Sequence, residues 1–308
     1  MSVNEISNRI KQLQAEKNAI ILAHYYTRPE VQEVADYLGD SLGLSRMAGR
    51  ADARVIVFCG VHFMAETASI ISPDKKVLIP ALHAGCSLAE SITGADLLAW
   101  RAAHPDGLVV CYVNTSADVK AHSDYCCTSS NAVKVVQSLP AGRPVLFVPD
   151  KNLGAYINKV TGREMELWHG DCCVHERLPA SLLLERLDEY PEAVALVHPE
   201  VNGSHDDRVL QHPRAFIAST AGMIEHARTS PCRQFIVATE LETIHQLKKN
   251  SPDKEFIPAL RTTLCGQMKK ITLERVLDAL EHEQFEVSVP DDTRRAARIP
   301  IQRMLEIQ

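Results

Sequence analysis

The sequence contains no apolar run long enough to cross a bilayer, which takes about 20 residues. Its first residues, Met1 to Ile6, lack the basic start and apolar core of a secretion signal. Basic residues are not in excess either, since 33 Lys and Arg stand against 39 Asp and Glu. We therefore expect a cytoplasmic protein that binds neither a membrane nor nucleic acid.

Two common cofactor motifs are also missing. No GxGxxG follows a predicted strand, which argues against a Rossmann dinucleotide enzyme. No CxxC pair occurs, although zinc sites usually have such closely spaced ligands. The nine cysteines are an odd number in a chain without a secretion signal, so a disulfide framework is not expected. Cys59 and Cys111 lie within apolar strands and are expected to be core residues.

What the sequence does contain is a pattern of short apolar strands and helices that runs three times. Each round ends in one cysteine, and these cysteines, Cys86, Cys172 and Cys265, are 86 and 93 residues apart. The tetrapeptide SPDK, followed by IPAL, occurs before the first of them and again before the third. Such regular spacing favours an internal repeat.

Short buried strands between helices predict parallel sheets that are covered by helices on both faces. We predict an α/β fold of three pseudo-threefold-related αβα domains, each with a short parallel sheet, around a central cavity. The expected domains are 1–87, 88–173 and 174–308, the last including two closing C-terminal helices. Ligands of such sheets gather at the carboxyl ends of strands, and polar residues follow the first strand of every unit.

Three thiolates from three units can share one metal centre. An iron–sulfur cluster with three cysteine ligands keeps one iron open to substrate, which suits catalysis. Zinc on three cysteines and one histidine is the second alternative. Three unconnected loop cysteines are the third, and spacing alone does not decide among them.

Longer stretches resemble quinolinate synthase along nearly the whole chain. The matching stretches are AHYY (23–26), GDSLGLS (39–45), CGVHFMAE (59–66), AGCSLA (84–89), YVNTSADVKA (112–121), CCTSSNA (126–132), the run from Trp168 to His175, HPE (198–200), STAGM (219–223), and Cys265 with Met268 and Lys269. The resemblance implies a transferase of NAD biosynthesis that condenses iminoaspartate with dihydroxyacetone phosphate to quinolinate, releasing phosphate and water. It implies one [4Fe–4S] cluster per chain, held by Cys86, Cys172 and Cys265, and L-aspartate oxidase as the supplier of the imine.

The resemblance also implies the site residues. Those with a catalytic role are His24, Tyr26, Tyr112, His198 and Glu200. Those that bind substrate are His24, Ser41, Tyr112, Val113, Asn114, Ser129, His198, Pro199, Glu200 and Thr220. Hydroxyls, amides and helix N-termini suit carboxylates and phosphate, and proton removal from carbon suits a carboxylate or an imidazole. Glu200 is the candidate base, oriented by or alternating with His198.

Several alternatives stay open. Cys173 adjoins Cys172, and the family's ligand position falls on Cys172. Ser219 is the alternative to Thr220, because the preceding polar stretch shifts the alignment. His175 is expected either beside the cluster, where it supports a ligand, or as an ordinary core or surface histidine. A metal-binding regulator that senses oxygen or iron is the competing function, and the sequence is compatible with a monomer or a homodimer.

Overall fold

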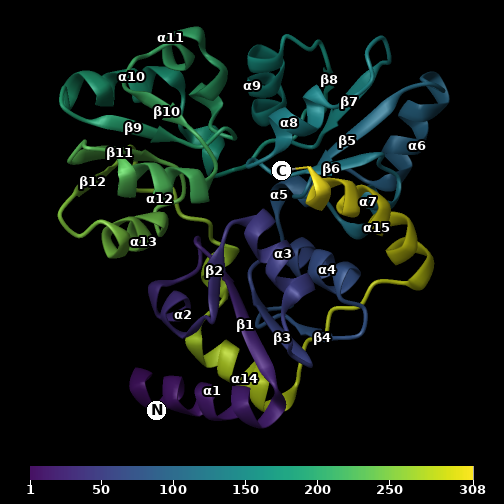
Figure 1. Cartoon of the computed structure of the whole chain (residues 1–308), viewed down its shortest axis with the longest axis vertical. Coiled ribbons are helices and arrows are strands. Elements are labelled where there is room, and N and C mark those ends of the chain that lie inside the picture. Colours follow the sequence, from purple (N-terminus) through teal and green to yellow (C-terminus); the bar gives the residue numbers. More distant parts are fainter. Residues whose placement is uncertain (308) are drawn as a thin grey trace.

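The computed structural model describes residues 1–307 and shows three lobes that meet near the centre of the molecule (Figure 1). Each lobe is built on one four-stranded parallel sheet. The strand orders are β2-β1-β3-β4, β6-β5-β7-β8 and β10-β9-β11-β12. Because the order is the same each time, the lobes are three copies of one αβα unit, and the predicted α/β fold is confirmed.

The helices and strands follow one another in the same sequence in each unit. The first unit contains α1 (Val3–Lys17), β1 (Ala19–His24), α2 (Pro29–Val34), β2 (Tyr37–Gly39), α3 (Ser41–Arg50), β3 (Val55–Cys59), α4 (His62–Ile71) and β4 (Lys76–Leu78). The second contains α5 (Ser87–Glu90), α6 (Gly94–Ala103), β5 (Leu108–Tyr112), α7 (Ala117–Ala121), β6 (Tyr125–Cys127), α8 (Ala132–Gln137), β7 (Val145–Val148), α9 (Lys151–Thr161), β8 (Glu166–Leu167) and the 3₁₀ helix η1 (His175–Arg177).

The third unit and the C-terminal helices complete the chain. The third unit contains α10 (Ala180–Glu189), β9 (Val194–Val197), η2 (Asn202–His205), α11 (Asp207–Leu210), β10 (Ala215–Ile217), α12 (Thr220–Thr229), β11 (Gln234–Ala238), α13 (Thr243–Asn250), β12 (Glu255–Pro258) and η3 (Met268–Lys270). Two further helices are α14 (Leu273–His282) and α15 (Asp291–Glu306).

The two central strands of each sheet are the apolar runs that the sequence marks most clearly. In the first sheet β1 pairs with β3 from Ala19↔Val55 to Ala23↔Cys59, and nearly all of these side chains are buried. Strand order reverses between the two central strands, and ligands of open α/β sheets bind at that point, beyond the carboxyl ends. Each of the three sheets therefore supplies one edge at which a ligand can bind.

Two of the six edge strands, β2 and β6, were not recognised from the sequence. Residues of β2 were predicted as the end of a helix, and residues of β6 as a polar turn. Each strand has only three residues and lies at the edge of its sheet, next to the first strand of its unit. A segment this short shows no hydrophobic period, so only its pairing with a longer strand identifies it.

The hydrophobic core is continuous through the first two units but separate in the third. One cluster of buried side chains extends through the first and second units and includes α14 and α15. The third unit has two clusters of its own, one on each face of its sheet. In Figure 1, α14 lies beside α1 and α15 beside α7. The closing helices thus cover the first two units, although they follow the third in the chain.

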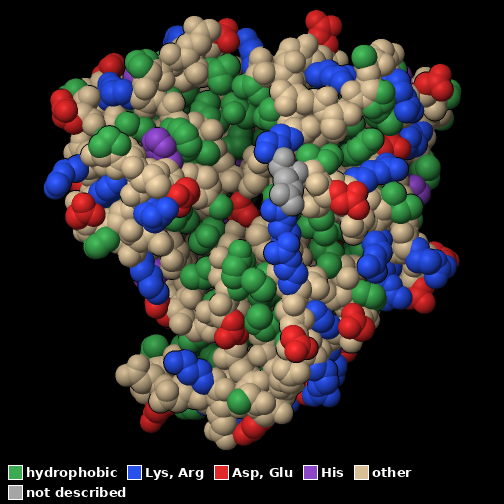
Figure 2. Space-filling model, viewed as in Figure 1, with side chains coloured by type: hydrophobic (Ala, Val, Ile, Leu, Met, Phe, Trp, Pro, Cys, Tyr) green, Lys and Arg blue, Asp and Glu red, His purple; other side chains and the backbone are tan. Residues whose placement is uncertain are grey.

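The surface carries charges of both signs, scattered over the face drawn in Figure 2. Within residues 1–307, every helix is too short or too polar to cross a bilayer.

Replacement of Asn131 by Ala should destabilise the docking of α15. The buried Asn131 amide donates hydrogen bonds to Met304 O (2.9 Å) and Ile307 O (3.3 Å) and accepts one from the Thr128 N–H (2.9 Å). Since buried backbone groups would lose their partners, we expect the free energy of unfolding to fall by about 1–3 kcal/mol. Urea denaturation measures this. The matched control is Gln302→Ala on the exposed face of α15, which should change the value by less than about 0.5 kcal/mol.

Candidate active site

The three cysteines lie at equivalent positions of the three units. In each unit, a backbone N–H just beyond the third strand binds the carbonyl two residues before the cysteine: His62 N to Ala84 O (2.8 Å), Lys151 N to Gly170 O (2.8 Å) and Leu241 N to Thr263 O (2.9 Å). The cysteine carbonyl then accepts from the residue four positions later: Glu90 N to Cys86 O (3.0 Å), Glu176 N to Cys172 O (2.9 Å) and Lys269 N to Cys265 O (3.1 Å). By both criteria Cys172 is the counterpart of Cys86 and Cys265, and Cys173 is one position out of register.

The thiol environments are equivalent as well. Burial raises the pKa of Cys86 to about 12, and it raises the pKa of Cys172 and of Cys265. Against this, backbone N–H groups two and three residues after each cysteine favour its thiolate: Leu88 and Ala89, Val174 and His175, Gln267 and Met268. Cys86 is close enough to Cys265 for the two thiolates to repel, and Cys172 likewise to Cys86. Such a set stays protonated by itself and fits a cationic metal group that thiolates can share.

The first strand of each unit delivers a ring side chain at its carboxyl end: His24, Tyr112 and His198. The two histidines have the same local geometry. Nδ1 of His24 accepts the N–H of Tyr26 (3.2 Å), and Nδ1 of His198 accepts that of Glu200 (3.3 Å). Burial lowers the pKa of His24 to about 4 and that of His198 to about 3. Both imidazoles are therefore neutral near pH 7, with the proton on Nε2, ready to donate to an anion.

The second strand of each unit is followed by a helix or turn whose start supplies a hydroxyl. Three backbone bonds are equivalent: Leu44 N to Asp40 O (2.9 Å), Ala132 N to Thr128 O (2.9 Å) and Met223 N to Ser219 O (2.8 Å). The next residue in each unit lines the central cavity: Ser41, Ser129 and Thr220. Ser219, the alternative to Thr220, instead caps α12 by accepting the Gly222 N–H (3.3 Å). The geometry thus selects Thr220.

Six side chains form a continuous series of hydrogen bonds across the cavity: Tyr112, Glu200, His175, Thr239, Tyr26 and Thr220. Tyr112 donates to Glu200 Oε1, while Glu200 Oε2 lies 2.9 Å from His175 Nδ1. His175 Nε2 lies 2.9 Å from Thr239 Oγ1, which is 2.8 Å from the Tyr26 hydroxyl. Tyr26 also reaches Thr220 Oγ1 at 3.1 Å. All three units contribute, so a proton can be passed along this series between them.

Glu200 is the buried anion of this series. Burial by itself raises the pKa of its carboxyl, but His175, and more weakly His198 and Tyr112, outweigh that effect and hold the pKa at about 2. Burial raises the pKa of Tyr26 and of Tyr112 well above the ordinary value, so both hydroxyls stay protonated. The nearest histidine to Glu200 is His175, at 2.9 Å, since His198 Nδ1 is 4.0 Å away. From the sequence, His198 was expected to be the histidine that orients Glu200 or alternates with it.

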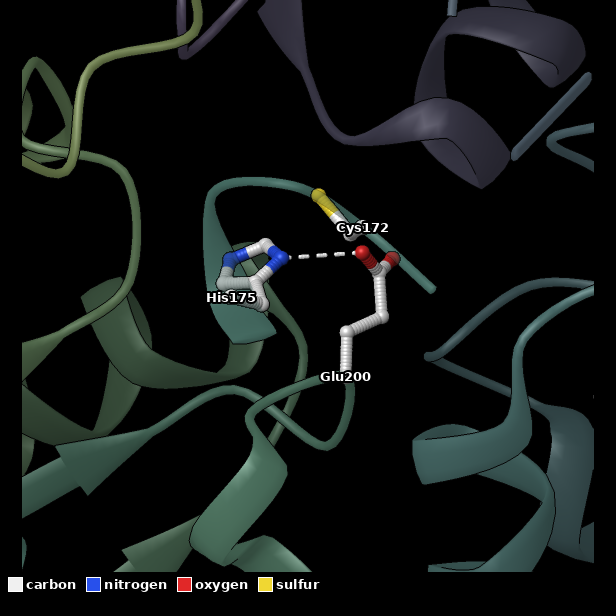
Figure 3. A group of neighbouring side chains, drawn as sticks. All are labelled: Cys172, His175 and Glu200. Carbon is white, nitrogen blue, oxygen red and sulfur yellow. Dashed lines mark hydrogen bonds and ion pairs between the residues drawn. The ribbon is translucent and has the colours of Figure 1, made fainter. Parts of the chain in front are cut away.

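His175 and Glu200 also belong to a group that could bind a metal ion. Together with the Cys172 thiol, their ligand atoms lie within 4.8 Å of one another (Figure 3). Both ring nitrogens of His175 are already hydrogen-bonded, to Glu200 and to Thr239. Metal binding by His175 would break one of these bonds, so the histidine is better explained as the partner of Glu200.

One cavity, with about 740 Å³ of empty volume, collects these residues. Of the predicted site residues, it is lined by His24, Tyr26, Ser41, Cys86, Tyr112, Asn114, Ser129, Cys172, His198, Glu200, Thr220 and Cys265. The predicted Val113 and Pro199 are outside its lining, and their buried positions support the strand ends instead. Asn114 Oδ1 is buried there and has no partner among residues 1–307, which leaves it for a ligand.

Two residues of this site, Thr239 and Glu240, were not predicted from the sequence. Thr239 and Glu240 follow the end of β11, and His175 was left between a supporting role and an ordinary one. Thr239 and Glu240 could have been identified by their position directly after a buried strand, because such positions lie at the ligand-binding edge of a parallel sheet.

The chain is similar to known proteins along nearly its whole length. It matches a family model described as "Quinolinate synthetase A protein" over residues 8–306. It is 48% identical over 305 residues to the quinolinate synthase of Pyrobaculum aerophilum, covering 98% of this chain and 99% of that protein. It is 49% identical over 302 residues to that of a Thermus thermophilus strain (98% and 97% covered), and 50% identical over 303 residues to that of Nostoc punctiforme (97% and 92% covered).

The free energy of unfolding should fall as the pH drops from 6.5 towards 4. The pKa of His24 and that of His198 are lowered by burial from 6.5 to about 4 and about 3, so in this range the unfolded chain binds protons that the folded chain does not. Each histidine should contribute a slope of about 1.4 kcal/mol per pH unit. Urea titrations at several pH values measure the slope. His24→Gln should flatten it, whereas the exposed His83→Gln should not; an equal slope in His24→Gln would contradict the assignment.

Proposed function

The chain belongs to the quinolinate synthetase A family, and from this premise we propose that it condenses iminoaspartate with dihydroxyacetone phosphate to form quinolinate. Phosphate leaves and two dehydrations complete the ring. The observation that carries the proposal is the equivalence of three cysteines around one cavity that also carries neutral donors and the buried, ionised carboxylate of Glu200. We further expect a cytoplasmic enzyme supplied with the imine by L-aspartate oxidase, as a monomer or a homodimer.

We propose that Cys86, Cys172 and Cys265 hold one [4Fe–4S] cluster. When bound, it would supply an iron with an open coordination position that acts as a Lewis acid. Three features of this chain fit such a group: three thiols at equivalent positions, paired N–H donors at each thiol, and the absence of any disulfide among the nine cysteines, all within residues 1–307.

Both substrates are anions, and we propose that uncharged donors bind them. The Nε2–H groups of His24 and His198 and the hydroxyls of Ser41, Ser129 and Thr220 point to one cavity. Ser41 and Thr220 are the first residues of ten-residue helices, whose N-termini favour anions. Neutral donors select carboxylate and phosphate oxygens while still allowing the charge to change during the reaction.

We propose that Glu200 and His175 act together as the base. The ionised Glu200 holds the His175 ring in place through Nδ1 and stabilises the imidazolium that forms when the ring takes a proton. From His175 Nε2, Thr239 connects the pair to Tyr26, whose hydroxyl is protonated and can return a proton to a departing hydroxyl group. Such an arrangement moves protons between two sides of the cavity, which a reaction with two dehydrations requires.

Replacement of Glu200 by Gln should lower the turnover number by on the order of a hundredfold or more, because the carboxylate that stabilises the base is lost. Iron content should stay unchanged, since Glu200 is not among the three thiol ligands. Anaerobic assays of quinolinate formation measure the first, and iron analysis the second. Glu192→Gln, an exposed residue before β9, is the matched control. Unchanged turnover in Glu200→Gln would contradict the role of the carboxylate, whereas wild-type protein that binds the metal but forms no quinolinate would argue for the competing function, a metal-binding regulator.

Anaerobically purified protein should be brown and contain about four irons and four sulfides per chain. Replacement of Cys86, Cys172 or Cys265 by Ser should abolish most of this content, whereas Cys173→Ser should retain it. Metal and sulfide analysis with the visible absorption spectrum decides this. Colourless protein with stoichiometric zinc would contradict the cluster and favour the zinc alternative.

A further inference from the structure

Glu240 is a second buried carboxylate at the cavity, and the proposed chemistry does not use it. It is fully buried and lines the cavity beside Cys265. Both of its oxygens are occupied: Oε2 accepts the Glu242 N–H (2.8 Å), and Oε1 accepts the Cys265 N–H (3.1 Å) and Lys269 Nζ (2.7 Å). A carboxylate with both oxygens engaged is suited to holding its neighbours in place rather than to reacting with substrate.

Lys269 extends this contact to the first unit. Its Nζ donates to the backbone carbonyl of Tyr26 (2.6 Å), and its own carbonyl accepts from Arg28 Nε (2.9 Å). One ammonium group therefore joins Glu240, and through it the amide of Cys265, to the segment that carries Tyr26. The side chain of Lys269 is only 14% exposed.

The second unit shows what is special about this pair. There Asp150 occupies the position of Glu240, just before the equivalent backbone contact, and Glu176 that of Lys269, four residues after the cysteine. Asp150 Oδ1 only caps its own helix α9. Glu176 pairs at 3.2 Å with Lys151, which occupies the position of Leu241, and these side chains are 33% and 38% exposed. A buried ion pair at the cysteine loop is thus a feature of the third unit.

We propose that the Glu240–Lys269 ion pair positions Cys265 and fixes its distance from Tyr26. Glu240 and Lys269 are then positioning residues, for the metal group and for proton transfer. The identity of the metal group rests on the proposed function. The cysteine loop does contact the core of the first two units, because Met268 and Ile271 belong to that cluster and Cys265 packs against it. Apolar packing has no preferred direction, so it does not by itself fix the register of the loop against the first unit. A buried pair with three directed hydrogen bonds supplies that register.

The test compares Lys269→Met, Glu240→Gln and the double variant with the wild-type protein. Lys269→Met leaves the charge of Glu240 buried without compensation. Glu240→Gln leaves Lys269 with the more exposed Glu242, whose Oε1 lies 3.8 Å away, and the double variant removes both buried charges. In metal-free protein, alkylation of Cys265 by iodoacetamide, followed by peptide mass spectrometry, should be on the order of tenfold faster in Lys269→Met. The rates at Cys86 and Cys172 should be unchanged and serve as internal controls.

In metal-loaded protein, Lys269→Met should lose iron to a colorimetric ferrous chelator faster by a similar factor. The rate of iron loss from the double variant should lie between those of Lys269→Met and wild type. Lys159→Met, which breaks an exposed ion pair with Asp207 between the second and third units, is the control and should match wild type. The proposal would be overturned if Cys265 were labelled at the wild-type rate in both Lys269→Met and Glu240→Gln. It would also be overturned if the change in labelling rate in the double variant were the product of the changes in the two single variants, because the two residues would then act independently.

Failure of the proposed function is visible separately. Wild-type protein that takes up zinc or no metal would refute the cluster, while the labelling of metal-free protein would still decide whether Glu240 and Lys269 position Cys265.

Discussion

The carboxylate of Glu200 is buried in the third unit, and the closed arrangement of the molecule depends on how its charge is compensated. A carboxylate removed from water costs several kcal/mol unless it is paired and hydrogen-bonded. Its two closest partners, Tyr112 and His175, both come from the second unit or its end. Most of the third unit has hydrophobic clusters of its own, so these polar contacts add to the packing of Met268 and Ile271 in joining it to the other two. The contacts that join the units at the cavity are therefore also those of the proposed base.

The same compensation of charge explains the composition of the cavity. With Glu200 ionised and Glu240 neutralised by Lys269, a substrate anion meets no free cation among the described lining residues. It meets instead imidazole N–H groups, hydroxyls and helix starts repeated around a pseudo-threefold axis. Three weakly polar walls can hold two different anions in one space, because each wall offers similar donors at a similar depth.

Much of this could be predicted from the sequence, and the reason is physical. Central strands of a parallel sheet are buried on both faces, so they appear as apolar runs, and the polar residues that follow them, such as His24 and His198, must lie at one edge. What could not be predicted depends on contacts between units. The pairing of His175 with Glu200, the ion pair of Glu240 with Lys269 and the packing of α14 and α15 on the first two units leave no periodic signal within any one segment. The edge strands β2 and β6 were missed because three residues are too few to show a hydrophobic period.

The backbone contacts that hold the three cysteine loops involve only amide and carbonyl groups, which every residue except proline can supply in full. The residues around the cysteines can therefore differ between the units, as long as none at the amide position is a proline. Ala84, Gly170 and Thr263 now occupy the same place with nothing in common but a carbonyl. The equivalence of the three units is thus carried by the geometry of the main chain, while the side chains at the same places differ.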